Sequence, residues 1–293
     1  MEYRQYLQQQ GYSESTITGN LRQVELFKKW CKRHGTAPEQ VDYKMCMKFI
    51  KHLTRKGNGK KTINHKLRNI KTYFDHLIGE AYRADNPIEG TIVKGEKRTI
   101  AHDLLETDEL EDLFYSFESD NATDKYALIC AKRNKAILGL IVYQGLGTTD
   151  LGNLKTGHLK LSKGKVYVPS TKRSNARELE LRPWQIMGLM EYQNEVLPLL
   201  QERNGNYMGK LFPTGTRFTV TTSQIIKKLK KYNQKVRDIK QLRASVITNW
   251  LGQHNLRKVQ YMAGHRYISS TERYLQDDLE NLHEMVNSFH PIQ

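Results

Sequence analysis

The chain has 293 residues, of which 38% are hydrophobic, so it can bury the core of one large or two ordinary globular domains. Its 47 Lys and Arg residues exceed its 31 Asp and Glu residues, which gives a formal net charge of +16. Such an excess favours a polyanionic partner, and we expect nucleic acid ahead of an acidic membrane surface. No apolar run approaches the roughly 18 residues of a membrane span, and the start, MEYRQYLQQQ, lacks the hydrophobic stretch of a signal peptide, so we expect a cytoplasmic protein.

The cysteines indicate neither a zinc site nor a redox pair. Cys31, Cys46 and Cys130 are odd in number and scattered, and none belongs to a C-x-x-C motif. We therefore expect reduced thiols in the core. No group of His, Asp and Glu residues has metal-ligand spacing, so the sequence predicts no metal and no cofactor.

Apolar residues in the first third of the chain recur every three or four positions, which is the spacing of amphipathic helices. The pattern predicts three helices, within residues 13–35, 38–57 and 60–82, with Ser15 as the N-cap of the first and Gly35 as its stop. Three helices in about 80 residues form a small bundle. Residues 1–102 hold 20 of the Lys and Arg residues against 10 Asp and Glu, so this is the more cationic part of the chain.

Cations on the polar side of the third predicted helix have a distribution suited to DNA phosphates, although a run of charges is also typical of a solvated face. They are Lys60, Lys61, Lys66, Arg68 and Lys71.

Pro87, Gly90 and Gly95 then interrupt the helical period, which predicts a linker over residues 86–102 between domains at 1–85 and 103–293. In the second domain ETDELEDLFYSF predicts a helix capped by Thr107, and RNKAILGLIVYQGLG predicts an apolar helix that ends at glycine. Alternating residues around turns at 162–164 and 174–175 predict short antiparallel strands. The expected fold is mostly α-helical, with one small antiparallel sheet in the second domain.

Four motifs of the second domain resemble boxes of the tyrosine recombinase (phage integrase) family. The segments are AGHRYISSTERY, similar to L-G-H-x-x-x-x-x-T-x-x-Y; KQLRASVITNWLGQHN, similar to H-x-L-R-H-(S/T)-F-A-T; STKRSNARELEL, similar to GKGxKxRxVPL; and YQGLGTTDLGNL, similar to Y-x-G-L-R-x-x-E-L-x-x-L. The resemblance covers essentially the whole chain. It implies a SAM-like core-binding domain at the N-terminus, a catalytic domain after it, and association with the nucleoid.

The resemblance also implies roles for individual residues. Tyr274 aligns with the nucleophile, Arg243 and His265 with groups around the phosphate, and Lys172 with the hairpin lysine. The chemistry agrees: a tyrosine hydroxyl can form a covalent 3′-phosphotyrosine, which conserves the energy of the broken phosphodiester bond. Guanidinium meets the charge on the non-bridging oxygens. Histidine can donate to these oxygens or handle the nucleophile's proton, and lysine can protonate the leaving 5′-oxygen.

Two positions depart from the family pattern. Lys240 stands where the second box usually begins with histidine, and it keeps a cationic donor three residues before Arg243. Gly147 stands where the first arginine is expected, and losing one such donor typically costs roughly 3–4 kcal/mol, or about 10²–10³ in rate. Arg173 and Arg177 are the nearest candidates in the sequence for a substitute donor.

Several functions follow from these patterns. A recombinase would exchange strands through a Holliday junction, with four copies on two double-stranded DNA sites and a C-terminal segment passed to a neighbouring copy. A catalytically degenerate relative would only bind and bridge DNA. An ordinary helix-turn-helix regulator would need neither Tyr274 nor Lys172, and the short chain with its separate basic domain disfavours a type IB topoisomerase.

Overall fold

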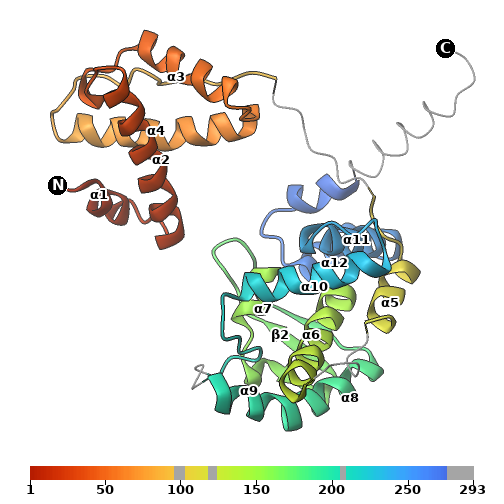
Figure 1. The fold of residues 1–293 in the computed structure, drawn as a ribbon. Coiled ribbons are helices and arrows are strands. Elements are labelled where there is room, and N and C mark those ends of the chain that lie inside the picture. The colour runs from red at the N-terminus through yellow and green to blue at the C-terminus, as the bar shows by residue number, and fades with distance from the viewer. Residues whose placement is uncertain (96–102, 118–123, 205–208, 276–293) are drawn as a thin grey trace, which may run out of the picture. The chain divides into compact units, whose positions relative to one another are not determined.

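The computed structural model describes residues 1–95, 103–117, 124–204 and 209–275, and these divide into two compact units, 1–99 and 100–293. Unit 1 is helical (Figure 1). Its helices are α1 (Tyr3–Gln9), α2 (Glu14–Arg33), α3 (Tyr43–Arg55) and α4 (Lys60–Gly79). None of the helices in the described ranges is long and apolar enough to cross a membrane.

The three helices predicted for unit 1 are confirmed as α2, α3 and α4, and α1 was not predicted. This helix has only seven residues and buries one apolar side chain, Leu7, so it carries almost no periodic signal. The predicted cap at Ser15 is wrong, because α2 begins at Glu14 with Ser13 as N-cap. Ser13 and Ser15 are both capping residues by type, and periodicity does not choose between them.

One apolar core fills unit 1. Phe27 and Trp30 of α2 pack against Phe49 of α3 and Phe74 of α4, with Phe27 and Phe74 fully buried. The stretch after α4 packs on the same core through Ile88, which is 3% exposed. Cys31 and Cys46 are buried free thiols, as predicted, and Cys130 of unit 2 is a partly buried one.

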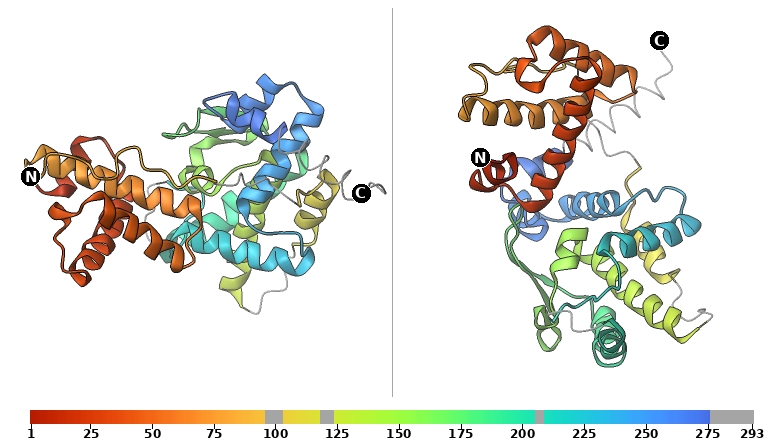
Figure 2. Two further views of the ribbon diagram at one scale, coloured as in Figure 1. Left: turned by 90° about the horizontal axis from the view of Figure 1, so that it is seen from above. Right: turned by 60° about the vertical axis from the view of Figure 1, so that its left-hand side comes forward.

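Unit 2 holds the remaining helices and one sheet (Figures 1 and 2). Its helices are α5 (Thr107–Tyr115), α6 (Lys125–Gln144), α7 (Thr148–Asn153), α8 (Pro183–Glu191), α9 (Leu197–Asn204), α10 (Phe218–Tyr232), α11 (Ile239–Gln253) and α12 (Leu256–Ala263), with a further helical stretch over 269–275. Its strands are β1 (Leu159–Lys160), β2 (Lys165–Val168) and β3 (Arg177–Glu180).

The sequence predicted the main features of unit 2. Helix α6 ends at Gln144 and its C-cap is Gly145, whose φ of 59° is the left-handed conformation that favours glycine at a helix end. The strands form an antiparallel sheet in the order β1-β2-β3, with Val166 opposite Leu179 and the first turn at Gly164. Thr107 is the first residue of α5 rather than its cap, because Glu106 occupies the cap position.

Helix α6 is the centre of unit 2. It packs against α5, α8, α10 and α11, and its residues Leu138, Leu140 and Ile141 are fully buried. Helices α7 and α11 lie on this core, and they carry two of the site boxes, so the core fixes the distance between those boxes.

Because each core draws its residues from one unit, a cavity in one core should destabilise that unit alone. Phe27→Ala should lower the unfolding free energy of unit 1 by about 3–5 kcal/mol, and Leu140→Ala that of unit 2 by about 2–5 kcal/mol. Hydrogen exchange in denaturant, resolved by segment, measures both. Leu26→Ala is the matched control because that side chain is 49% exposed and should change little. Equal losses in both units from either core variant would show that the cores are not independent.

Candidate functional site

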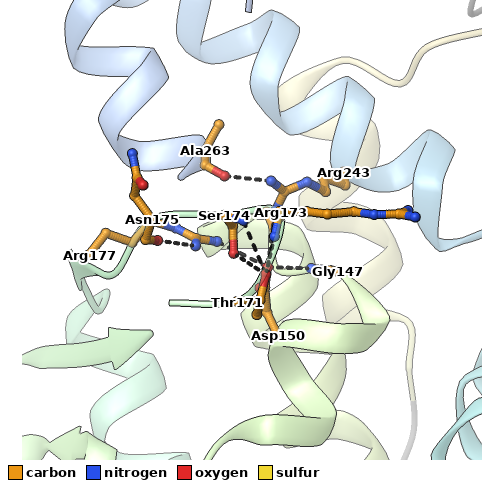
Figure 3. Close-up of polar contacts among 10 residues, drawn as sticks. Gly147, Asp150, Thr171, Arg173, Ser174, Asn175, Arg177, Arg243 and Ala263 are labelled. Atoms are coloured by element: carbon orange, nitrogen blue, oxygen red, sulfur yellow. Dashed lines mark hydrogen bonds and ion pairs between the residues drawn. The ribbon is translucent and has the colours of Figure 1, made fainter. Parts of the chain in front are cut away.

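A single carboxylate oxygen joins three segments of unit 2. Oδ2 of Asp150, on α7, accepts hydrogen bonds from Nη2 of Arg177 at 3.0 Å, the backbone N–H of Gly147 at 3.3 Å, and Nη1 of Arg243 at 3.4 Å (Figure 3). Asp150 is only 7% exposed. These charged contacts therefore form in a low dielectric, where they are stronger than at the surface.

The Arg243 guanidinium is held by backbone as well as by charge. Nη1 also donates to the carbonyl of Gly145 and Nη2 to the carbonyl of Ala263, both at 2.5 Å, and the side chain is 17% exposed. A guanidinium has five N–H donors. These three bonds leave two donors without a partner among the described residues, so Arg243 can bind an anion without losing its anchors.

Arg177 and Arg173, the sequence candidates for a substitute donor, occupy different positions. The Arg177 side chain has no exposed area, and its Nη1 donates to the carbonyl of Asn175 at 3.4 Å. Burial lowers the pKa of Arg177 and the Asp150 carboxylate opposes this shift. Arg173 is exposed on the loop between β2 and β3, and Figure 3 shows its side chain extending away from Asp150.

Position 147 has room for a side chain. Gly147 has a φ of −87°, which any residue can adopt. A Cβ atom there would lie 3.8 Å from Cδ of Arg243 and 3.9 Å from Oδ2 of Asp150, both ordinary contact distances. The backbone therefore does not require glycine at this position.

Gly264 is required by its surroundings. Its φ is 71°, and a Cβ atom would lie 2.4 Å from Nη1 of the buried Arg177. Its carbonyl accepts the backbone N–H of Asn175 at 2.9 Å, and the next residue, His265, forms a β-bridge with Ser174. The Gly-His pair thus lets the β2–β3 loop approach the end of α12.

Lys172 lies on this loop, between anchored positions. The N–H of Thr171 bonds the carbonyl of Ser174 at 2.9 Å, and Arg266 donates to the Thr171 carbonyl at 2.8 Å. Lys172 itself is exposed. The fold therefore brings the loop that carries Lys172 beside the segment that carries His265.

His265 lies between a buried hydroxyl and the Tyr274 ring. Its Nδ1 is 2.9 Å from Oγ1 of Thr271, which is fully buried, and its ring stacks on that of Tyr274 with centroids 5.9 Å apart and planes 5° apart. Burial, reinforced by the positive charges of Arg243 and Arg177, lowers the pKa of His265 to about 4. His265 is therefore neutral near pH 7.

Lys240 is exposed on the first turn of α11 and lines a groove of about 510 Å³ between α7, α10 and α11. Thr148, next to Gly147, lines the same groove with three further cations, Lys227 and Lys230 of α10 and Arg237 just before α11. The groove also exposes Ser223, so its walls combine positive charge with hydroxyl donors.

The five cations that the sequence singled out on α4 are partly engaged within unit 1. Lys66 donates to Oδ1 of Asn58 at 2.9 Å, and Lys71 lies 3.5 Å from Oε1 of Glu89. Arg68 and Lys71 line a pocket of about 370 Å³ beside residues 88–92, while Lys60 and Lys61 are exposed.

Three residues of the site were not assigned roles from the sequence: Asp150, Thr271 and Gly264. Each stands at a defined position of one of the family motifs given above, but a motif does not reveal which atoms contact one another. The apolar residues Leu279, Leu282, Met285 and Val286, predicted to form a face exchanged between copies, lie outside the described residues.

Comparison with known proteins covers both units. The phage integrase family model matches residues 104–281, and the model of the phage integrase N-terminal SAM-like domain matches residues 1–81. Among curated relatives, "Tyrosine recombinase XerC" of Pseudomonas putida strain F1 is 27% identical over 95% of this chain and 91% of its own length. The protein of the same name from Bacillus pumilus is 27% identical over 98% of this chain and 94% of its own length.

Two solved structures share the fold. The Tn1549 transposon integrase in complex with transposon right end DNA superposes with a TM-score of 0.65 at 17% identity, covering 96% of this chain and 98% of that one. A lambda integrase tetramer bound to a Holliday junction superposes with a TM-score of 0.64 at 14% identity, covering 93% of this chain and 74% of that one. With the family model matching more than half of the chain, the chain belongs to the phage integrase family.

Proposed function

We propose that the chain is a site-specific DNA recombinase that breaks and rejoins strands through a covalent 3′-phosphotyrosine and a Holliday junction. The stacking of Tyr274 on His265, beside the anchored Arg243 and the Lys172 loop, is the observation that carries this function. The relatives named tyrosine recombinases, and the solved integrases in complex with DNA, support it.

In the proposed cleavage step the Tyr274 oxygen attacks the scissile phosphorus. A bond forms between phosphorus and the tyrosine oxygen, the bond to the 5′-oxygen breaks, and the phenol proton passes to solvent. Lys172 gives a proton to the departing 5′-oxygen. Arg243 and Lys240 donate to the non-bridging oxygens, whose charge grows in the transition state. Religation reverses these steps with a new 5′-hydroxyl.

His265 contributes as a hydrogen-bond donor in this scheme. The Thr271 hydroxyl is fully buried, and among the described residues Nδ1 of His265 is its one acceptor. A buried hydroxyl that does not donate loses a hydrogen bond at a cost of about 1–3 kcal/mol, so Thr271 donates and Nδ1 accepts. The ring proton of the neutral imidazole then sits on Nε2, where it can bond a phosphate oxygen.

Arg177 acts in this proposal as a positioning residue rather than as a phosphate donor. Its buried guanidinium fixes Asp150, and Asp150 in turn fixes Arg243. Arg173, exposed on the loop, is the candidate that remains for a donor in place of the missing first arginine.

At the level of the whole chain, we assign DNA binding to a core-binding domain at residues 1–85 and catalysis to residues 103–293. Phosphates beside the scissile one follow the groove lined by Lys240, Lys227 and Lys230. Four copies assemble on two DNA sites, each passing the segment after Tyr274 to a neighbour.

Gly147 supports a second function, that of a catalytically degenerate relative that binds and bridges DNA. Without the first arginine the site lacks one donor to the non-bridging oxygens, and such a loss costs about 10²–10³ in rate. The two functions differ in one observable, the covalent adduct.

A nicked suicide substrate, whose short 5′ fragment diffuses away, should trap a covalent protein–DNA adduct on a denaturing gel. Tyr274→Phe should abolish the adduct and keep DNA affinity, because it removes only the nucleophilic oxygen. Arg173→Ala should slow adduct formation about 10²–10³-fold if it supplies the substitute donor. An unchanged rate in Arg173→Ala would exclude that role.

Gly147→Arg separates the two functions, because position 147 accommodates a side chain without backbone strain. Adduct from wild type establishes the recombinase, with a faster rate expected for the variant. Adduct only from Gly147→Arg identifies a disabled recombinase. No adduct from either protein on a verified cognate site removes the phosphotyrosine mechanism and leaves a DNA-binding protein.

Thr271→Val should convert His265 to the wrong tautomer, because valine matches threonine in shape and removes the hydroxyl donor. Single-turnover cleavage should slow by about 10²-fold, the cost of one phosphate donor, while DNA affinity is unchanged. Thr271→Ser, which keeps the hydroxyl, is the control and should retain most of the rate. The ¹⁵N shifts of the His265 ring report the tautomer directly, and wild-type shifts in Thr271→Val would contradict the proposal.

The low pKa of His265 makes stability depend on pH in the DNA-free protein. Its pKa is about 4 when folded against an ordinary value of about 6.5, so the unfolded chain binds more protons between these values. The stability that the folded protein gains from a neutral His265 is fully present above pH 6.5 and is lost as the pH falls to 4. Urea unfolding should show that the free energy of unfolding falls less between pH 7 and pH 5 for His265→Gln than for wild type. Equal falls in the two proteins would mean that His265 titrates normally.

A further inference from the structure

A second cationic site lies in unit 1, on α3 rather than on α4. A cavity of about 230 Å³ between α2 and α3, here the α3 pocket, is lined by Trp30, His34, Lys48, Lys51, His52 and Arg55. It is distinct from the pocket beside residues 88–92 that Arg68 and Lys71 line. The α3 pocket thus gathers three permanent cations and two imidazoles around one indole.

The cations of the α3 pocket have no protein counter-ion in the described part of the chain. Lys48, Lys51 and Arg55 follow one another at three- and four-residue steps, so they share one face of α3. None of their side chains makes an ion pair or a hydrogen bond with another described residue, whereas the side chains of Lys66 and Lys71 of α4 are both engaged. Like charges at this spacing repel, and an anion between them would relieve the repulsion.

Trp30, which lines the pocket, carries a buried donor that has no acceptor among the described residues. Trp30 is 4% exposed, and its indole N–H has no hydrogen-bond partner among the described residues. Its ring is fixed by stacking on His34, with centroids 4.2 Å apart, and by an edge contact with Phe49. A buried N–H without an acceptor destabilises the protein, and an oxyanion that enters the pocket deeply enough to reach this nitrogen would supply the acceptor.

The electrostatic field at the pocket is positive in the absence of a ligand. Burial lowers the pKa of His52, and the charges of Lys56, His34, Arg33 and Arg55 lower it further. A bound anion would reverse this effect on the pKa. The field, the unpaired cations and the indole donor therefore favour the same kind of ligand, a small oxyanion with several acceptor atoms.

We propose that the α3 pocket binds a backbone phosphate of DNA, in addition to the phosphates contacted by α4 and by the catalytic unit. The assignment rests on the proposed function only in taking DNA as the source of the phosphate. A phosphodiester fits because it offers two non-bridging oxygens to the indole N–H and the guanidinium while the lysines neutralise its charge. DNA binding through this pocket is independent of sequence, because it involves no base edge.

The salt dependence of DNA binding by the full chain tests the proposal. Each neutralised phosphate contributes about −0.9 to the slope of log K against log salt. Replacing Lys48, Lys51 and Arg55 by Gln should make the slope less negative by about 0.9 and weaken binding to any duplex, measured by fluorescence anisotropy. The charge-matched control replaces Lys125, Lys163 and Lys210 of unit 2, which are exposed outside the grooves described. An equal change in both variants would reduce the effect to net charge and overturn the site.

A neutral substitution tests the indole donor separately. Trp30→Phe keeps an aromatic ring in the core but removes the N–H, so DNA affinity should fall about threefold to tenfold, the effect of one hydrogen bond, with the salt slope unchanged. Trp184→Phe is the control, because Trp184 is 44% exposed in unit 2 and lies outside the pocket. Wild-type affinity in Trp30→Phe, with wild-type unfolding, would exclude a phosphate at the indole.

NMR of the Trp30 indole N–H and the His52 ring distinguishes the ligand sources. A duplex should shift both signals at micromolar concentration and inorganic phosphate only at millimolar concentration, with a rise in the His52 pKa in each case. Stronger binding of inorganic phosphate or of a polyglutamate peptide than of the duplex would overturn the assignment to DNA. Adduct formation by the variant with Lys48, Lys51 and Arg55 replaced by Gln is measured separately, at saturating DNA. If the recombinase mechanism proves wrong, the binding and NMR results still decide whether the α3 pocket holds a phosphate.

Discussion

The carboxylate of Asp150 is the interaction on which the rest of the site depends. It is buried, and it faces a guanidinium from β3 and another from α11. Breaking a buried pair by removing one partner typically costs about 3–5 kcal/mol, because the remaining charge is left uncompensated. Arg177 has no exposed area and therefore no access to water if Asp150 is lost. The orientation of Arg243 thus depends on a charge that need not touch a substrate.

The second half of the site depends on a close approach between the backbone of the β2–β3 loop and the end of α12. Gly264 lies against the Arg177 guanidinium in a left-handed conformation, and its carbonyl ties the β2–β3 loop to the end of α12. A side chain at this position would separate the loop from His265 and displace Arg177 at the same time. The same glycine therefore couples the position of Lys172 to the position of the Asp150 pair.

The sequence predicted the elements of this fold better than it predicted the contacts between side chains. Regular apolar spacing located α2, α3 and α4, an apolar stretch that ends at glycine located α6, and a glycine turn located the β1–β2 connection, because these features depend on neighbours in the chain. The short α1 and the choice between Ser13 and Ser15 as a cap depend on packing that periodicity does not record. Arg177 looked like an available donor because nothing in its local sequence shows that β3 turns it inward onto Asp150. The tautomer that we propose for His265 likewise depends on Thr271, six residues away on the helical stretch 269–275.

Gly147 changes the charge balance of the site as well as its donor count. Asp150, Arg177 and Arg243 together carry a net charge of one positive unit, and a first arginine would raise this to two. His265 already feels the two arginines, which hold its pKa low in addition to burial. A further cation would favour its neutral form still more. In the proposed mechanism the glycine thus removes a phosphate donor without removing the conditions that keep His265 neutral, so the histidine would donate through Nε2 with or without that arginine.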